Sequence, residues 1–402
     1  MENQNKYGEG PLKGLKVLDL TRILSGPFAC TWLGQMGARV IKIENPSDPD
    51  ITRSYEPFKN GVSAYFPTFN HNKECITLNL KAEKGKDLFK RLILTADVVI
   101  ENFRPGVMEK LGLGWEALSA VNPRLVFARL SGFGQTGRSS RKAGYDVSAQ
   151  AISGIMHLTG PEDGPPFRVG SSIGDTVSGI TVLVAILAAL YNREQTGHGQ
   201  MVETSLVDSL ISLSTSDYIR YFAGGDPPRR VGNIYKWWTP YGTYKAKDNY
   251  YIIGGANDHF FGLLCQAMDM PELARDPRFV HNKERVDHRQ ELDDIINAWA
   301  ADKTADEICR RLRQYGVPTG QVNSIEEISR DEHIAEARDM FPVLHQETVG
   351  DIRVTNIPVR FHRSGLAPLK SAHGLGADNQ EILGELGLSE EEIASLRREN
   401  II

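Results

Sequence analysis

The sequence predicts an α/β protein, with a Rossmann-like, doubly wound parallel sheet in a large domain and a smaller α+β domain. Three observations lead to this fold class. A strand, a helix and a second strand follow one another within about thirty residues near the N-terminus. The same alternation recurs to about residue 205, and the texture of the sequence changes after it. The chain has 402 residues, of which 41% are apolar, so it can bury the cores of two or three domains.

The first strand–helix–strand unit begins with residues 16–20 (KVLDL), a short apolar run typical of a buried strand. Residues 21–27 form a loop that ends in a proline suited to the first turn of a helix. Residues 28–36 are apolar-rich and predict that helix, which Gly37 closes. Residues 39–44 (RVIKIE) give the second strand. A helix between two strands implies that the strands are parallel.

The alternation then continues along the chain. We expect helices at residues 83–94 and 115–121, and strands at residues 97–101 and 124–130. This repeated pattern assigns residues 1–205 to the large domain.

The second half differs in composition. Residues 206–230 are assigned to a linker, because they contain the sequence AGGDPPRR. Residues 241–253 predict a hairpin with a Lys-Asp-Asn turn. Residues 231–330 then form the small domain, and residues 331–402 form a second linker and a C-terminal return to the large domain.

Charge and composition exclude several classes of function. The net charge of −5 gives no general reason to expect nucleic acid as a partner. Residues 1–14 are polar and lack the apolar core of a signal peptide, and the most apolar stretch, residues 180–190, is too short to span a bilayer. The cysteines are far apart and show no metal-binding spacing. We therefore expect a cytoplasmic protein with reduced, mostly buried thiols, no bound metal and no membrane contact.

A glycine motif at residues 132–137 (GFGQTG) matches the dinucleotide-binding fingerprint. That fingerprint works only in the first strand–helix turn, where a pyrophosphate rests on a helix N-terminus. Here the motif follows a later strand and is followed by RSSRKAG instead of a helix start. A basic loop is the better interpretation, in which Arg138, Arg141 and Lys142 could meet phosphates.

Asp175 stands at the start of a predicted apolar helix, in a natural N-cap position. From this feature alone, an ordinary helix cap is the more common explanation. Helix-terminal amides would also favour the ionised carboxylate and hold it in place. Glycines at 170, 174 and 179 would let a bulky substrate approach, and such a carboxylate can attack an activated acyl group.

Residues 14–44 (GLKVLDLTRILSGPFACTWLGQMGARVIKIE) resemble the opening of the class III coenzyme A transferases. That family includes formyl-CoA, carnitine-CoA and succinyl-CoA:dicarboxylate transferases. Similar motifs follow in order to about residue 374: NHNK at 70–73, VIENFRPG at 99–106, LSGFGQTG at 130–137, AGYD at 143–146, GD at 174–175 and TGHGQ at 196–200.

The resemblance implies that Asp175 is the catalytic nucleophile. It would attack an acyl-CoA donor to give an aspartyl-acyl anhydride, which the CoA thiolate converts into an aspartyl-CoA thioester. A free carboxylate would then accept CoA from that thioester. The reaction needs a CoA thioester as substrate and no permanently bound cofactor, and the site must exclude water from its intermediates.

The resemblance also implies contacts to coenzyme A. Matching positions are Leu24, Ser25, Asn45, Asn70, His71, Asn72, Lys73, Asn102, Phe103, Arg104, Lys110 and Lys142. The cations among them could meet phosphates, and Phe103 could stack on adenine. Asn45 departs from the arginine of formyl-CoA transferases. Leu24 departs from their oxalate-binding glutamine, which makes oxalate an unfavourable acceptor.

The pocket for the reacting acid is implied at Leu24, Tyr145, Asp146, Gly254 and Gly255. The last two match a glycine loop that shields the intermediates in the family, although a simple turn after a strand explains them equally well. Residues 153–164 are similar to the branch of the family that uses succinyl-CoA and small dicarboxylic acids.

Two alternatives stay open. An α-methylacyl-CoA racemase of the same fold would place histidine where Tyr145 stands, and a tyrosine is a poor base at neutral pH. A catalytically silent CoA-binding subunit is the other alternative, which Asp175 and its glycines disfavour. The family architecture implies a homodimer of interlocked rings, with a hetero-oligomer as the other possibility.

Overall fold

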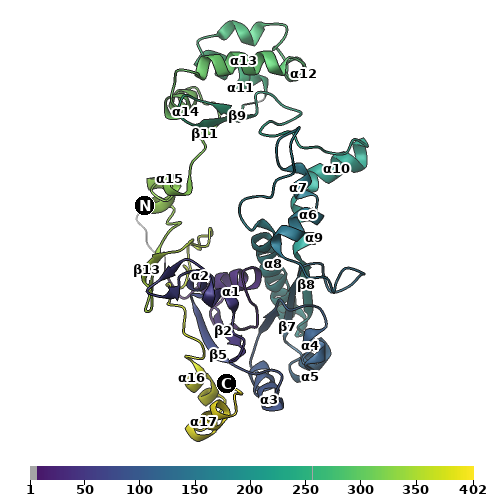
Figure 1. Cartoon of the computed structure of the whole chain (residues 1–402), viewed down its shortest axis with the longest axis vertical. Coiled ribbons are helices and arrows are strands. Elements are labelled where there is room, and N and C mark those ends of the chain that lie inside the picture. Colours follow the sequence, from purple (N-terminus) through teal and green to yellow (C-terminus); the bar gives the residue numbers. More distant parts are fainter. Residues whose placement is uncertain (1–6, 256) are drawn as a thin grey trace. The chain divides into compact units, whose positions relative to one another are not determined.

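A computed structural model describes residues 7–255 and 257–402 (Figure 1). The chain divides into two compact units. The large unit comprises Met1–Ile155, Arg168–Ala223 and Ala335–Ile402, and the small unit comprises Met156–Phe167 and Gly224–Ile334.

The large unit is built on a six-stranded sheet in which every neighbouring pair is parallel. The strands stand in the order β5-β2-β1-β6-β7-β8, so the order reverses between β1 and β6. This is the doubly wound order, and the predicted parallel α/β sheet is confirmed. The strands are β1 (Lys16–Asp19), β2 (Arg39–Glu44), β5 (Lys73–Thr77), β6 (Val98–Glu101), β7 (Val126–Ser131) and β8 (Met201–Ser205).

Both faces of this sheet are buried, because alternate residues of each strand face opposite helical layers. On β1, Leu18 belongs to one apolar core and Val17 to the other. The layer on the Leu18 side contains α3 (Glu83–Ile93), α4 (Val107–Lys110), α5 (Trp115–Val121), α16 (Asn379–Glu385) and α17 (Glu390–Arg398). The layer on the Val17 side contains α1 (Ser25–Gln35), α6 (Asp146–Ile152), α8 (Ile173–Thr196) and α9 (Leu206–Leu213).

The edge strand β5 is closed by the C-terminal segment of the chain. Asp378 accepts a hydrogen bond from the amide of Cys75, and Asn379 accepts one of 2.8 Å from the amide of Thr77. These two amides point away from β2 and would otherwise be unpaired. A segment about 300 residues downstream therefore completes the sheet edge.

Two helices occupy most of residues 206–230, which the composition assigned to a linker. They are α9 and α10 (Thr215–Gly224). The Ser205 hydroxyl caps α9 by accepting the amide of Asp208 at 3.0 Å, and Leu206 and Leu210 are buried in the core. The glycines and prolines that suggested a linker begin only at the end of α10.

The remaining elements of the large unit are short and peripheral. They are a 3-10 helix η1 (Ile51–Ser54), β3 (Phe58–Lys59), β4 (Val62–Ser63), α2 (Tyr65–Asn70), β12 (Val343–Gln346) and β13 (Gly350–Arg353). The short helix α7 (Ile155–Leu158) and a π-helix, η3 (Glu332–Ala337), lie where the chain passes between the units.

The small unit has a three-stranded antiparallel sheet, β11-β10-β9, and its own apolar core. The predicted hairpin is confirmed as β9 (Gly242–Lys245) paired with β10 (Tyr250–Ile253), and β11 is Thr319–Gln321. Its helical segments are α11 (Asp258–Ala267), η2 (Pro271–Arg275), α12 (Asn282–Asp287), α13 (Arg289–Ala300), α14 (Ala305–Gln314) and α15 (Ile325–Ile328).

Helix α8 is longer than the apolar run 180–190 that the sequence suggested. Its most apolar 18-residue window has a mean hydropathy of 2.0, so by length and composition alone it is able to cross a membrane. Core helices of soluble proteins pass the same test, and 44% of that window is buried against the rest of the chain.

Candidate functional site

A pocket of about 190 Å³ lies beside the point where the strand order of the large unit reverses, between β1 and β6. In doubly wound sheets, ligands bind at the carboxyl ends of the strands at this switch point. The pocket is lined by Arg22, Ile23, Leu24, Ser25, Asn102, Phe103, Arg104, Pro105, Leu130, Ser131, Gly132, Lys142, Ala143, Gly144, Tyr145, Asp175 and Leu206.

One wall of the pocket is the loop between β1 and α1. The side-chain amide of Asn102, just after β6, accepts the amide of Arg22 and donates to its carbonyl oxygen, both at 2.8 Å. A Cβ atom on Gly26 would come within 2.3 Å of Thr21, so the loop folds back closely on the start of the helix. This brings Leu24 and Ser25 to the pocket.

Asp175 is the third residue of α8, so the predicted N-cap position is wrong. The helix begins at Ile173 and its N-cap is Ser172, three residues earlier than expected. The reason is Asp146, at the start of α6, whose Oδ1 atom accepts the amide of Gly174 at 2.7 Å. Asp146 therefore does the capping, and its other oxygen accepts Gln150 at 2.7 Å. Within residues 7–255 and 257–402 no group donates a hydrogen bond to the carboxylate of Asp175, so this carboxylate is free to react.

The pKa of Asp175 is raised to about 7, first by burial and then by the neighbouring charge of Asp146. Asp175 is half-buried and lines the pocket. Its own charge helps to raise the pKa of Tyr65, after the effect of burial, which places that phenol nearby. A carboxylate with a pKa near neutrality is more nucleophilic than an ordinary aspartate when it is ionised.

The glycines around Asp175 differ from expectation. A Cβ on Gly179 would lie 2.7 Å from the carbonyl oxygen of Ser25, and a Cβ on Gly174 would lie 3.0 Å from Asp146. These two glycines allow protein segments to pack closely, so a role in admitting substrate is wrong for them. Only Gly170 has open space in front of it. The close crossing at Gly179 holds α8 against the start of α1, which brings Asp175 to Ser25.

The structure gathers most of the residues expected to contact coenzyme A. Leu24, Ser25, Asn102, Phe103, Arg104 and Lys142 line the same pocket as Asp175, as does Tyr145 of the predicted acid pocket. Asn45 lines a neighbouring pocket of about 240 Å³. Arg22 and Phe103 line both pockets, so the two adjoin. Together they offer an elongated ligand a basic pocket and a more apolar one.

The run from Asn70 to Lys73 lines neither of these pockets. All four side chains are buried. The ammonium group of Lys73 donates to Asp19 at 2.9 Å, to Asn70 at 3.0 Å and to the carbonyl oxygen of Pro27 at 3.1 Å. Its charge and its three protons are therefore already used within the protein.

Two neighbours in this run are equally internal. Asn72 donates to the carbonyl oxygen of Pro368 at 2.8 Å, which fastens the C-terminal segment. Burial lowers the pKa of His71 to about 4, so the ring is neutral at physiological pH. Lys110, by contrast, is exposed at the end of α4 and lines neither pocket.

Gly254 and Gly255 follow β10 in the small unit. The amide of Gly254 donates to the carbonyl oxygen of Pro318 at 2.9 Å, so the predicted loop starts from the sheet. The next residue of the loop, Ala256, lies outside the described residues. A role for these glycines beside Asp175 stays a prediction.

Arg22 and Ser131 are the polar pocket residues that sequence reasoning missed. Arg22 lines both pockets and pairs with Asp48 at 2.9 Å. Ser131, at the end of β7, is 6% exposed, and its hydroxyl has no hydrogen-bond partner among the described residues. Ser131 stands in the motif at 130–137, one residue before its first glycine, and that place at a strand end was the available signal.

The described residues show no group of three or more His, Cys, Asp and Glu side chains able to hold a metal ion. The four cysteines, Cys30, Cys75, Cys265 and Cys309, are free and buried, as expected.

Comparisons with known proteins agree on one family. The family model described as CoA-transferase family III matches residues 12–379. A succinyl-CoA–D-citramalate CoA-transferase from Chloroflexus aurantiacus is 38% identical over 98% of both chains. An acetyl-CoA:oxalate CoA-transferase from Acetobacter aceti is 41% identical over 79% of this chain and 82% of its own length.

A solved structure is similar as well. A protein from Brucella suis, described as a CAIB/BAIF family protein, superposes with a TM-score of 0.84 and 36% identity, covering 95% of this chain and all of that one. The fold, the sequence and the family model thus point the same way, and the chain belongs to CoA-transferase family III and is a CoA-transferase.

Proposed function

We propose that this enzyme moves coenzyme A from succinyl-CoA to a small dicarboxylic acid, with Asp175 as the covalent nucleophile. The observation that carries the proposal is the carboxylate of Asp175. It is half-buried, its pKa is raised to about 7, and it has no hydrogen-bond donor in the described part of the chain; it lines a switch-point pocket with Arg104 and Lys142. Family membership supplies the reaction class, and this carboxylate supplies a group able to perform it.

The proposed reaction has four steps. A carboxylate oxygen of Asp175 attacks the thioester carbon, the C–S bond breaks, and CoA leaves as a thiolate. The thiolate attacks the aspartyl carbon of the anhydride, frees the donor acid and forms an aspartyl-CoA thioester. The acceptor carboxylate expels the thiolate again and forms a second anhydride. The thiolate then attacks the acceptor carbon of that anhydride and frees Asp175.

The two adjoining pockets support an extended position for coenzyme A. The cations Arg104 and Lys142, which form no ion pair with the residues that the structure describes, suit its phosphates, and the more apolar pocket beside Phe103 suits its adenine. The thioester end would then lie at Asp175. Residues 70–73 would support this pocket from behind without touching the ligand, because they are buried.

The acids are proposed from the relatives. The acceptors in their names, D-citramalate and oxalate, are both dicarboxylic acids, whereas the donors are succinyl-CoA and acetyl-CoA. Succinyl-CoA is the donor in the name of the relative that matches 98% of this chain. Leu24 cannot donate the hydrogen bond expected of an oxalate-binding glutamine, but a relative named for oxalate keeps that acid in the test panel.

We also propose that two copies of the chain assemble. Helices α8, α9 and α10 expose large apolar side chains, among them Val184 at 60%, Tyr191 at 72% and Phe222 at 73%. Exposed apolar surface of this extent usually marks an interface. Sedimentation should give a mass twice that of one chain, and a monomer at micromolar concentration would contradict the proposal.

The deciding experiment is a mass-spectrometric peptide map after incubation with succinyl-CoA or acetyl-CoA, with and without acceptor acids. A CoA thioester on the Asp175 peptide, absent in Asp175→Ala, is the expected result. We expect activity to fall on the order of 10³-fold or more in that variant. No adduct, together with deuterium uptake at the α-carbon of a branched acyl-CoA, would instead make the enzyme a racemase.

A further inference from the structure

The loop after β1 contains a strained residue. Ile23 has a φ of +72°, in the left-handed region that a β-branched side chain rarely adopts. It lines the Asp175 pocket immediately before Leu24 and Ser25. A conformation of this kind persists only where the surroundings enforce it, and such residues gather at functional sites.

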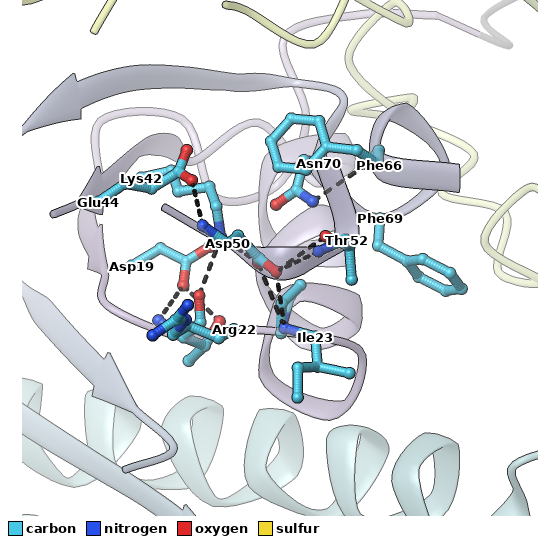
Figure 2. Close-up of polar contacts among 12 residues, drawn as sticks. Asp19, Arg22, Ile23, Lys42, Glu44, Asp50, Thr52, Phe66, Phe69 and Asn70 are labelled. Carbon is cyan, nitrogen blue, oxygen red and sulfur yellow. Dashed lines mark hydrogen bonds and ion pairs between the residues drawn. The ribbon is translucent and has the colours of Figure 1, made fainter. Parts of the chain in front are cut away.

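The enforcing groups are side chains that bond to the loop backbone (Figure 2). Both carboxylate oxygens of Asp50 accept the amide of Ile23, at 3.2 and 3.3 Å. The ammonium group of Lys42 donates to the carbonyl oxygen of Thr21 at 2.9 Å and to Asp50 at 3.1 Å. Asp19 accepts the amide of Thr21 at 2.8 Å. With the Asn102 amide on Arg22, the loop is held by side chains at three successive residues.

The carboxylate of Asp50 cannot turn away from this position. It is fully buried, and it also accepts the amide of Thr52 at 3.1 Å and the hydroxyl of that residue at 2.8 Å. Its own amide donates to Glu44 at 2.8 Å. The Lys42 charge, 1% exposed, balances it. A buried carboxylate with this many donors is held in one orientation.

We infer that Asp50 and Lys42 are positioning residues of the transferase reaction, which hold Ile23 left-handed so that Leu24 and Ser25 present one fixed surface to the reacting acyl group. Lys42 lines neither pocket, and Asp50 lines only the neighbouring pocket, not the one that contains Asp175. Both act through the backbone of the loop. The inference rests on the proposed function, because it concerns the geometry of the same pocket.

The test uses three variants: Asp50→Asn, Ile23→Gly and the double variant. Asparagine keeps the shape but loses the charge and one acceptor. We expect the turnover number to fall on the order of tenfold, with a smaller change in KM, because a small misplacement of the pocket wall costs rate. Glycine adopts a positive φ without the Cβ clash. The double variant should therefore recover most of the rate lost in Asp50→Asn.

The matched control is Asp97→Asn, because Asp97 pairs with Arg193 at 2.8 Å and accepts the amide of Lys16 at 2.8 Å, just before β6 at the opposite end of the sheet. It should lower thermal stability without changing turnover. Full turnover in Asp50→Asn, or a loss that Ile23→Gly does not relieve, would overturn the inference.

Failure of the proposed function would look different. If the unaltered enzyme forms no Asp175 adduct, the covalent mechanism fails whatever the variants do. The affinity of the same four variants for coenzyme A, measured by calorimetry, still tests the loop in that case. Weaker binding in Asp50→Asn that Ile23→Gly restores would support the positioning role, and unchanged binding would refute it.

Discussion

The pocket around Asp175 has two unlike walls. In the first wall, residues 21–25, buried or half-buried side chains from other segments bond to the backbone of Thr21, Arg22 and Ile23. The second wall, residues 132–145, is exposed or half-buried throughout, and among the described residues no side chain forms a hydrogen bond with residues 132–144. A close approach of Gly132 to Gly144 shapes its base. The first wall is prepared before ligand binds, whereas the second is available to respond to it.

This difference has a chemical meaning. A wall that is fixed in advance contributes to rate, since it costs nothing to organise at the moment of reaction. A wall of exposed cations contributes mainly to affinity for phosphates. Changes in the first wall should therefore alter turnover and stability, and changes in the second should alter KM. The following predictions test that division, from the largest expected effect to the smallest.

Lys42→Met should have the largest effect of the three variants, and it should act on the stability of the fold. It leaves Asp50 buried at 0% exposure without its balancing charge. Loss of one partner of a buried pair costs about 3–5 kcal/mol of the free energy of unfolding. Denaturant titration measures this loss. A change below about 1 kcal/mol would mean that the first wall is not held by its charges.

Lys142→Ala should act on affinity. Lys142 is exposed on the second wall and lines the pocket. Loss of one charge-assisted phosphate contact should raise the KM for the acyl-CoA about tenfold, with turnover nearly unchanged. Steady-state kinetics provide the measurement, with Arg138→Ala, whose side chain does not line the pocket, as control. A drop in turnover alone would contradict the division between the walls.

Asp146→Asn should give the smallest effect, a shift in the pH dependence. The neighbouring charge of Asp146 adds to burial in raising the pKa of Asp175 to about 7, so removing that charge should lower the pKa. The ionised form reacts, so labelling of Asp175 should rise with pH through about 7 in the unaltered enzyme. The rise should occur about one pH unit lower in the variant.

Asparagine still accepts the amide of Gly174, so the start of α8 is kept. The pH profile of adduct formation, measured in a single turnover, isolates this shift from product release. A rise at unchanged or higher pH would show that Asp146 does not act on Asp175 through its charge.

Local pattern was enough to predict the sheet. The strand at 39–44 agrees with β2 residue for residue, because apolar runs and turn residues decide strands that are buried on both faces. Features that depend on contacts between distant residues, such as the start of α8, could not be predicted from local sequence. Asp146 caps α8 from 28 positions away, so Asp175 took a place inside the helix. The left-handed conformation of Ile23 could not be predicted from the sequence, because a β-branched residue rarely adopts a positive φ.

The positions that form the candidate site could be predicted in part, but their individual roles could not. A resemblance identifies which positions matter, but it does not separate contact from support. Lys73 and Asn70 look like ligand residues by type, and only their burial shows that they hold Asp19 and the loop. Ser131, whose free hydroxyl faces no partner among the described residues, gave no such chemical hint.

The closure of β5 by Asp378 and Asn379 sets an order for synthesis on the ribosome. The strands of the sheet are all made by residue 205, but the amides of Cys75 and Thr77 wait for partners about 300 residues later. Until the last part of the chain emerges, the nascent sheet keeps an open edge able to pair with another chain. Products that terminate early should therefore be prone to aggregate, even though they carry Asp175 and its pocket.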